Sequence, residues 1–229
     1  MSDLTLLIPA KNESESLPIF LNELINFDYQ KLIVMDKEDF ETIESIKNFK
    51  NVKILYQEKL GYGNALIEGI NAIETKYFCI INADGSMNPQ ELKNMLSIIE
   101  KDNYDAVFGS RYMNDAGSED DDFITLIGNY VFTFLGKFLF KLRLSDILYT
   151  YVLGKTKLIK DLKLKYYDFR ICVELPILAK FNNLNFISTP SKERRRIGGK
   201  KKVNVLKDGF LILTAILILF FKKIFKLHN

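Results

Sequence analysis

Through the first half of the chain, short runs of apolar residues alternate with longer segments that carry one apolar face. A short uninterrupted apolar run is typical of a strand buried on both faces, whereas apolar positions at i, i+3, i+4 and i+7 predict a helix. The pattern predicts strands over Leu4–Pro9, Lys31–Asp36, Val52–Gln57, Tyr77–Ile81 and Asp105–Ser110. Helices are predicted between them, over Ser16–Phe27, Phe40–Phe49, the segment after Gly61 and Gln90–Lys101. This alternation predicts an α/β fold, a mostly parallel sheet with helices on both faces.

Beyond Arg111 the pattern changes to long apolar segments. The segment Phe123–Leu142 is apolar around most of its circumference, and its narrow polar stripe consists of Thr125, Asn129, Thr133 and Lys137. We expect a helix of this kind to be buried on several sides, in protein as the commoner case or against lipid. A helix over Tyr167–Lys180 and a strand over Leu184–Thr189 are predicted next.

The last apolar segment, Gly209–Phe221, has 13 uncharged residues, and charged residues bound it on both sides. As a helix it would be about 20 Å long, shorter than the roughly 30 Å of membrane hydrocarbon. Its only polar side chain is Thr214, whereas a core helix is expected to show a polar face. We interpret it as a helix at the membrane interface or half of a hydrophobic surface in a homo-oligomer, with a soluble core helix as the alternative.

The 229 residues fit one α/β domain with additions, or at most two small domains. We assign this domain to residues 1–205, with a nucleotide-binding part over 1–112 and an acceptor part over 113–205, and a tail to residues 206–229. The net charge of +3 is too small to indicate a nucleic-acid partner. An acidic cluster (Asp115 and Glu119–Asp122) and a basic one (Lys192–Lys202) are each typical of a solvated loop.

Two further features bear on the compartment. Cys79 and Cys172 lie in apolar surroundings without metal-ligand spacing, which is typical of reduced cysteines in a cytosolic protein. The polar residues near the start of the chain predict no signal peptide.

The segment Asn82–Pro89 carries the candidate chemistry, because it joins a predicted buried strand to a predicted helix and holds the carboxylate of Asp84. Ligands bind at the carboxyl edge of open α/β sheets, and a hard cation there would take oxygen ligands from Asp84 and from nucleotide phosphates. An Asp-Gly turn that only caps its own backbone is the alternative. Polar residues follow the other strands too, at Glu13, Asp36, Lys59 and Arg111, so a ligand cleft is predicted at this edge.

The turn after the first strand contains no G-x-G-x-x-G pattern, which argues against a dinucleotide enzyme. Six segments instead resemble the family 2 glycosyltransferases with the GT-A fold, specifically polyprenyl-phosphate sugar transferases such as dolichol-phosphate mannose synthase. They are Leu7–Glu13, Leu32–Asp36, Lys59–Ala65, Asn82–Pro89, Gly109–Tyr112 and Arg196–Lys202. They occur in the family's order, at suitable spacing, and are spread over nearly the whole chain.

The resemblance implies a set of functional residues. Binding of the nucleotide sugar, UDP- or GDP-linked, would involve Pro9, Ala10, Glu13, Asp36, Lys59, Gly63, Asn82 and Ala83. Asp84 and Ser86 would hold Mg²⁺ or Mn²⁺, the cations that suit an oxygen-only site. A polyprenyl phosphate would be bound by Arg111, Arg196 and Lys202 and approached by Asp146. The protein would act at the cytoplasmic face of a membrane.

Three departures from the family pattern affect the predicted site. The D-x-D metal motif is Asn82-Ala83-Asp84 here, so one carboxylate is replaced by an amide. The second strand ends in Met35-Asp36-Lys37-Glu38 in place of D-D-G-S, which leaves the base open. In the R-x-x-G-x-S-K loop, Lys201 replaces the serine and adds a positive charge.

The type of acceptor decides which catalytic groups the enzyme needs, and this leaves alternative functions open. A phosphate oxygen is already an anion and needs no strong base, whereas a hydroxyl of a glycan or glycolipid needs a carboxylate, for which Asp146 and Glu174 are the candidates. The departures at Lys37 and Asn82 are what a non-catalytic nucleotide-sugar-binding protein of the same fold would also show.

Overall fold

The computed structural model describes residues 3–225. Its central sheet has the strand order β3-β2-β1-β4-β7-β5-β8, and every strand except β7 runs in the same direction. The strands are β1 Leu4–Ala10, β2 Gln30–Met35, β3 Lys53–Tyr56, β4 Tyr77–Ile80, β5 Ala106–Ser110, β7 Val152–Lys155 and β8 Phe186–Pro190. Two short strands, β6 Gly117–Ser118 and β9 Lys192–Glu193, pair beside it. The predicted α/β class and mostly parallel sheet are confirmed.

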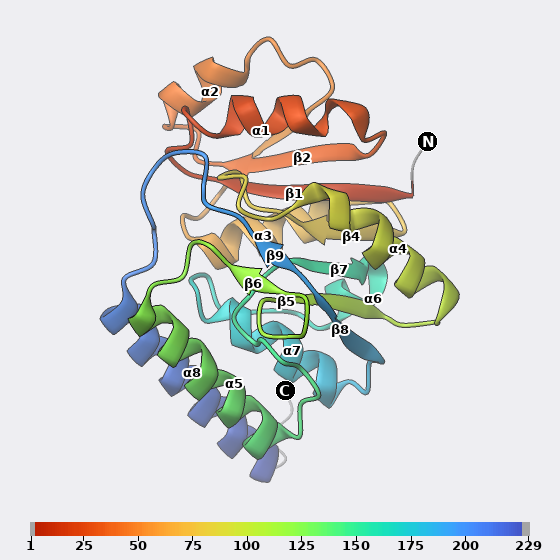
Figure 1. The fold of residues 1–229 in the computed structure, drawn as a ribbon, viewed down its shortest axis with the longest axis vertical. Coiled ribbons are helices and arrows are strands. Elements are labelled where there is room, and N and C mark those ends of the chain that lie inside the picture. The colour runs from red at the N-terminus through yellow and green to blue at the C-terminus, as the bar shows by residue number, and fades with distance from the viewer. Residues whose placement is uncertain (1–2, 226–229) are drawn as a thin grey trace.

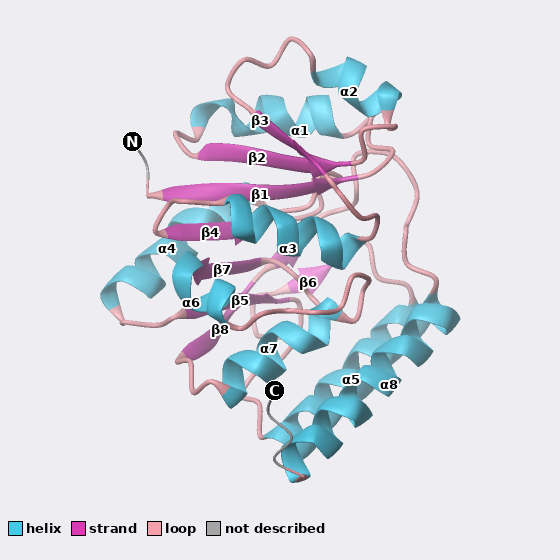
Figure 2. Ribbon diagram, turned by 180° about the vertical axis from the view of Figure 1, so that it is seen from behind, coloured by secondary structure: helices cyan, strands magenta, loops and turns pink. Residues whose placement is uncertain are grey.

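Helices cover both faces of this sheet (Figures 1 and 2). Successive side chains of a strand point to opposite faces of the sheet. Neighbouring residues such as Leu6 and Leu7 therefore pack into two different hydrophobic clusters, one on each face. One cluster includes α1 Leu17–Glu23, α2 Phe40–Ile46 and α4 Leu92–Lys101. The other includes α3 Tyr62–Ala72, α6 Thr156–Asp161 and α7 Ile171–Phe181. Single 3-10 turns occupy Leu24–Asn26 and Pro89–Glu91, and the side chain of Asn88 caps the second of them.

A further layer lies outside α7, where α5 Phe123–Phe140 and α8 Val205–Ile224 run side by side (Figure 1). Their shared core contains Phe140 of α5, Val173 of α7, and Ile212, Ile216 and Leu219 of α8. Helix α8 has 20 residues and is about 30 Å long. It is thus longer than the helix of about 20 Å that we predicted from the uncharged run Gly209–Phe221.

Helix α5 packs with its polar stripe inward. Asn129 and Thr133 are buried, and they bond to Tyr112 and to the backbone N–H of Ile147. The apolar side chains point outward instead: Phe123, Ile124, Ile127, Tyr130, Val131, Phe134 and Phe138 are all exposed. The expectation that α5 is buried on several sides in protein is therefore wrong. Within residues 3–225, α5 is the one helix long and apolar enough to cross a membrane, by length and composition alone.

Strand β7 was not predicted from the sequence. It pairs antiparallel with both β4 and β5, so the segment after α5 returns to the centre of the sheet. The parts that we assigned to nucleotide and acceptor binding consequently share one sheet and one core.

Candidate active site

A cavity of about 550 Å³ opens at the carboxyl ends of β1, β2 and β4, a volume within the usual range for small-molecule sites. Eleven of the residues predicted from the sequence line it, from five separate segments: Pro9, Ala10, Glu13, Asp36, Asn82, Ala83, Asp84, Ser86, Arg111, Arg196 and Lys202. The parallel strands bring these segments together, which is the convergence that the sequence predicted.

The turn after β4 fixes one oxygen of Asp84 and leaves the other at the cavity. Oδ1 accepts hydrogen bonds from the backbone N–H and the hydroxyl of Ser86, at 3.0 and 2.8 Å. Oδ2 lies 3.7 Å from the guanidinium of Arg196. Gly85 has φ +73°, and a Cβ there would lie 2.4 Å from Ile197. Asp84 therefore caps its own turn and also faces the ligand space.

Residues 194–204, which we call the strap, cross over this turn and lead into α8 (Figure 1). Arg194 and Ile197 donate backbone hydrogen bonds to the carbonyls of Ser86 and Asp84. Two strap cations reach carboxylates at the cavity: Arg196 pairs with Asp120 at 2.7 Å, and Lys202 lies 3.3 Å from Glu13. The basic cluster is thus part of the site and not simply a solvated loop.

Asn82 is held by a partly buried tyrosine. The Tyr62 hydroxyl donates to Asn82 Oδ1 at 3.2 Å and also bonds to Thr150 at 2.6 Å, while its ring stacks on Phe169. Burial raises the pKa of Tyr62 far above its usual value, so this hydroxyl stays a donor. With its oxygen engaged, the amide of Asn82 offers N–H groups to a ligand, where an aspartate would offer negative charge.

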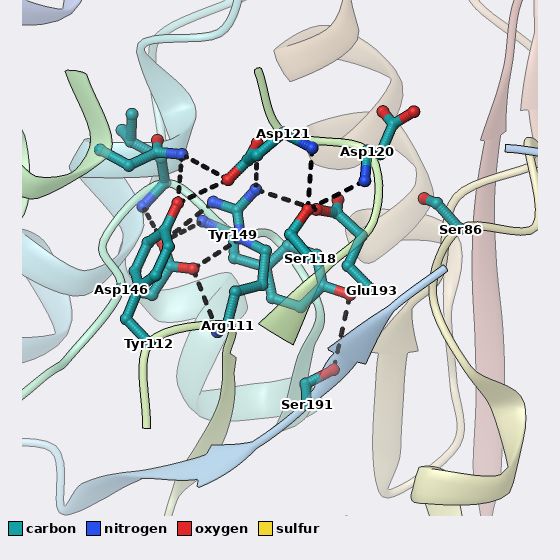
Figure 3. A network of polar contacts seen from close by, with 12 residues as sticks. Ser86, Arg111, Tyr112, Ser118, Asp120, Asp121, Asp146, Tyr149, Ser191 and Glu193 are labelled. Carbon is teal, nitrogen blue, oxygen red and sulfur yellow. Dashed lines mark hydrogen bonds and ion pairs between the residues drawn. The ribbon is translucent and has the colours of Figure 1, made fainter. Parts of the chain in front are cut away.

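Arg111 lies at the centre of a buried ion-pair network (Figure 3). Its guanidinium contacts Asp146 at 2.7 Å and both Asp121 and Glu193 at 3.3 Å, and the side chains of Arg111 and Asp146 are 7% and 0% exposed. Although burial alone would lower the pKa of Arg111, Asp146 raises it well above its ordinary value. Burial also raises the pKa of Glu193, which Arg111 partly offsets.

This network favours a structural role for two residues that were predicted to act on the acceptor. Arg111 was expected to bind a lipid phosphate, but its N–H groups are already directed at three carboxylates. Asp146 was expected to act as a base or to line the acceptor side, but it does not line the cavity and its carboxylate neutralises Arg111. Both residues stabilise the wall of the cavity.

Glu174 is likewise structural. Its carboxylate accepts hydrogen bonds of 2.9–3.0 Å from the backbone N–H groups of Lys165 and Tyr166, and burial raises its pKa. It does not line the cavity, and its expected role as a base stays a prediction that Glu174→Gln can test. It holds residues 164–170, the loop that brings Asp168 and Phe169 to the cavity.

Gly63 and Lys59 also lie outside the cavity lining. A Cβ on Gly63 would lie 2.2 Å from the carbonyl oxygen of Tyr166, so the glycine lets the loop pack against the start of α3. The ammonium group of Lys59 lies over the Tyr167 ring.

The sequence missed several residues that the structure places in the cavity, namely Tyr62, Asp120, Asp121, Asp168, Glu193 and Lys201. Asp120 and Asp121 belong to the acidic cluster, whose expected role was that of a solvated loop. Only the pairing of β6 with β9 brings them beside the strap, so no local signal could have shown their position.

The oxygen groups present fit a divalent cation that is shared with a substrate. Asp84 presents one carboxylate oxygen to the cavity, 3.7 Å from a positive charge. Ser86 is better placed to orient Asp84 than to bind metal, because its hydroxyl donates to that carboxylate. No group of three or more acidic, His or Cys side chains suited to a metal occurs among residues 3–225. A cation here would therefore need phosphate oxygens as further ligands, as is usual for Mg²⁺.

A mostly parallel sheet with a polar cavity at its carboxyl edge is typical of α/β proteins that bind a ligand at the strand ends. The model of the family described as glycosyl transferase family 2 matches residues 5–163, well over half of the chain. The chain belongs to this family, and it is a glycosyltransferase.

Relatives and solved structures agree with this assignment. An uncharacterized protein of Methanocaldococcus jannaschii is 25% identical over 94% of this chain and 91% of its own length. An uncharacterized glycosyltransferase of Mycobacterium tuberculosis is 31% identical over 47% of this chain and 48% of its own. Glucosyl-3-phosphoglycerate synthase of M. tuberculosis, solved with Mn²⁺, UDP and phosphoglyceric acid, has a TM-score of 0.70 at 11% identity, over 95% of this chain and 78% of that one. The last likeness confirms the GT-A fold.

Proposed function

We propose that this chain transfers a sugar from a nucleotide-diphosphate sugar to a polyprenyl phosphate, dolichyl or undecaprenyl, at the cytoplasmic face of a membrane. One observation carries the proposal: a single cavity runs from Asp36 and Asp84 to an apolar wall on α5 and α8, and cations of the strap lie in it. An acceptor with an anionic head and an apolar tail matches such a cavity.

The chemistry needs little from acid–base groups. An oxygen of the acceptor phosphate attacks the anomeric carbon, the bond from that carbon to the diphosphate breaks, and the nucleoside diphosphate leaves with the electron pair. The attacking oxygen is already an anion, so no proton has to be removed. This agrees with Asp146 and Glu174 being fully engaged in structural bonds.

The negative charges of the acceptor phosphate and of the leaving diphosphate would be neutralised by the strap cations and by a metal ion on Asp84. Arg196 and Lys202, now paired with Asp120 and Glu13, would exchange these carboxylates for phosphate oxygens, to which a guanidinium offers a matching planar fork. Mg²⁺ or Mn²⁺ on Asp84 would neutralise the diphosphate as it leaves. The related synthase has been solved with either ion and UDP. UDP- and GDP-linked sugars are therefore the donors to test.

The membrane location rests on the inverted polarity of α5. Its polar stripe faces protein while Phe134 and Phe138 are 63% and 72% exposed, and Phe210 and Phe221 of α8 are 67% and 53% exposed. Exposed aromatic side chains on these two packed helices favour a contact surface, because large exposed apolar patches are typical of membrane or protein contact sites. Lys222 and Lys223 at the end of α8 would interact with anionic lipids, at about 1 kcal/mol per charge.

The test is a panel of UDP- and GDP-sugars with undecaprenyl or dolichyl phosphate in detergent, with and without Mg²⁺ or Mn²⁺. We expect one donor to yield a metal-dependent sugar-phospholipid, and Asp84→Ala to abolish it. If no donor gives this product with either acceptor, the proposal is wrong. Binding of the donor without any transfer would favour a non-catalytic nucleotide-sugar-binding protein.

Transfer to a glycan or glycolipid hydroxyl is a second candidate, because Asp120 lines the cavity and could serve as the base. Asp120→Asn distinguishes the two acceptors. It should abolish transfer to a hydroxyl, whereas transfer to a phosphate should persist because it needs no base.

A further inference from the structure

Two glycines face the apolar end of the cavity from different helices. Gly128 lies in α5 and Gly209 in α8, and both line the cavity. A glycine inside a helix destabilises it by comparison with alanine, so a glycine at such a position requires a compensating reason. Close packing is the usual reason, and it does not apply here.

A Cβ added to Gly128 would meet no atom within 4 Å, and one added to Gly209 would come no nearer than 4.0 Å to Phe132. Gly136, also in α5, shows the contrast, because a Cβ there would lie 2.7 Å from Ile147. Packing explains Gly136 and leaves Gly128 and Gly209 unexplained. The space beside these two glycines belongs to the cavity itself.

The walls around this space are apolar and lead to the outer surface. Ile124 and Phe132 lie one turn on either side of Gly128, and Ile212 lies one turn after Gly209. Ile124 and Val205 line the cavity and are 65% and 41% exposed, so the apolar end opens onto the exposed face of α5 and α8.

Cationic side chains line the same cavity beside this apolar wall. They are Lys201 and Lys202 of the strap and Lys207 in the first turn of α8. A ligand that contacts both the lysines and the apolar wall must carry an anionic group and a hydrocarbon chain. A peptide or a soluble sugar phosphate has no such chain.

We propose that the notch between Gly128 and Gly209 is the subsite for the first isoprene units of the lipid acceptor, and that the absence of side chains at these positions determines which acceptors enter. The inference rests on the proposed function and adds to it the path of the chain. The lipid would pass from its phosphate at the strap, between the first turns of α5 and α8, to the apolar face beyond.

The test uses Gly128→Leu and Gly209→Leu in the full chain, with a photoreactive diazirine analogue of farnesyl phosphate as the probe. We expect labelling of wild-type peptides within residues 123–140 and 205–224 and at least about tenfold less labelling of either variant. Gly117→Leu is the matched control, because a Cβ there also meets nothing within 4 Å and the residue lies outside the cavity lining. UDP or GDP binding, measured by calorimetry, should be equal in all four proteins.

Each outcome separates the inference from the proposed function. If wild type forms the sugar-phospholipid and both leucine variants label and react as wild type, the subsite is wrong while the function stands. If the leucine variants lose labelling and wild type transfers no sugar to the lipid, the notch binds the lipid chain but the proposed function is wrong. A wild-type dimer that Gly128→Leu converts to a monomer, without specific labelling, would assign the notch to a second copy of the chain and overturn the inference.

Discussion

Replacing Arg111 by methionine tests whether the buried network is structural. The change removes the cation that neutralises Asp146, whose side chain is 0% exposed, and leaves Asp121 and Glu193, at 9% and 11%, without their partner. Breaking a buried pair in this way costs about 3–5 kcal/mol because a charge remains uncompensated. For a chain of this size the melting temperature should fall by about 6 to 20 °C.

The effect should depend on pH with a definite sign. Burial raises the folded-state pKa of Glu193 above its unfolded value, and Arg111 lowers it in part. A carboxyl group with a raised folded pKa becomes destabilising as the pH rises through its unfolded pKa, and the penalty is complete above the folded pKa. The penalty disappears again as the pH falls below the unfolded pKa and both states are protonated. Without Arg111 this penalty grows. The gap between wild type and Arg111→Met should therefore be largest near neutral pH and shrink under acid conditions.

The measurement is urea denaturation followed by circular dichroism between pH 5 and 8. Lys47→Met is the control, since Lys47 pairs with Glu44 at the surface and its loss should cost less than about 1 kcal/mol. Adding Asp146→Asn to Arg111→Met should restore part of the stability, because the stranded charge is removed. A loss below about 1 kcal/mol, or a gap that does not narrow in acid, would refute the structural role and make Arg111 a phosphate-binding candidate again.

Three other predictions concern the site and the outer face. Glu174→Gln should weaken donor binding through the 164–170 loop without changing the pH profile of transfer; a lost pH limb would instead indicate a base. Tyr62→Phe should lower donor affinity, and unchanged calorimetric affinity would contradict the orientation of Asn82. Phe134→Ser with Phe138→Ser should reduce sedimentation with anionic vesicles while leaving thermal stability unchanged, because both rings are exposed; unchanged sedimentation would exclude this face from membrane contact.

The sequence predicted the sheet through local signals. The runs at Leu4–Pro9 and Tyr77–Ile81 are apolar because both faces of a central parallel strand are covered, so these short uninterrupted apolar runs located β1 and β4. Because the carboxyl edges of parallel strands coincide, the strand pattern was enough to place Glu13, Asp36 and Asp84 together at one cavity. Strand β7 escaped prediction because its pairing with β4 and β5 joins segments far apart in the chain.

In the candidate site, too, some residues could be identified from local sequence signals and others could not. Asp84 was identifiable because a turn after a buried strand has a fixed place in such a fold. The roles of Arg111, Asp146 and Glu174 were not, because sequence records charge but not the partner that neutralises it. Burial of an unpaired charge is costly, and the tertiary structure met that cost by directing these groups at each other or at backbone N–H groups.

Sequence by itself determined that the segment 123–140 is a helix with a narrow polar stripe, since helical periodicity is a local property; the predicted end at Leu142 is two residues too late. Only the tertiary structure decided which side faces inward. Tyr112, Asp121 and the N–H of Ile147 lie on the protein side and hydrogen-bond Asn129 and Thr133, so the stripe is satisfied internally and the aromatic face is left outward. Buried polar groups require partners, and where those partners lie is a property of the folded chain.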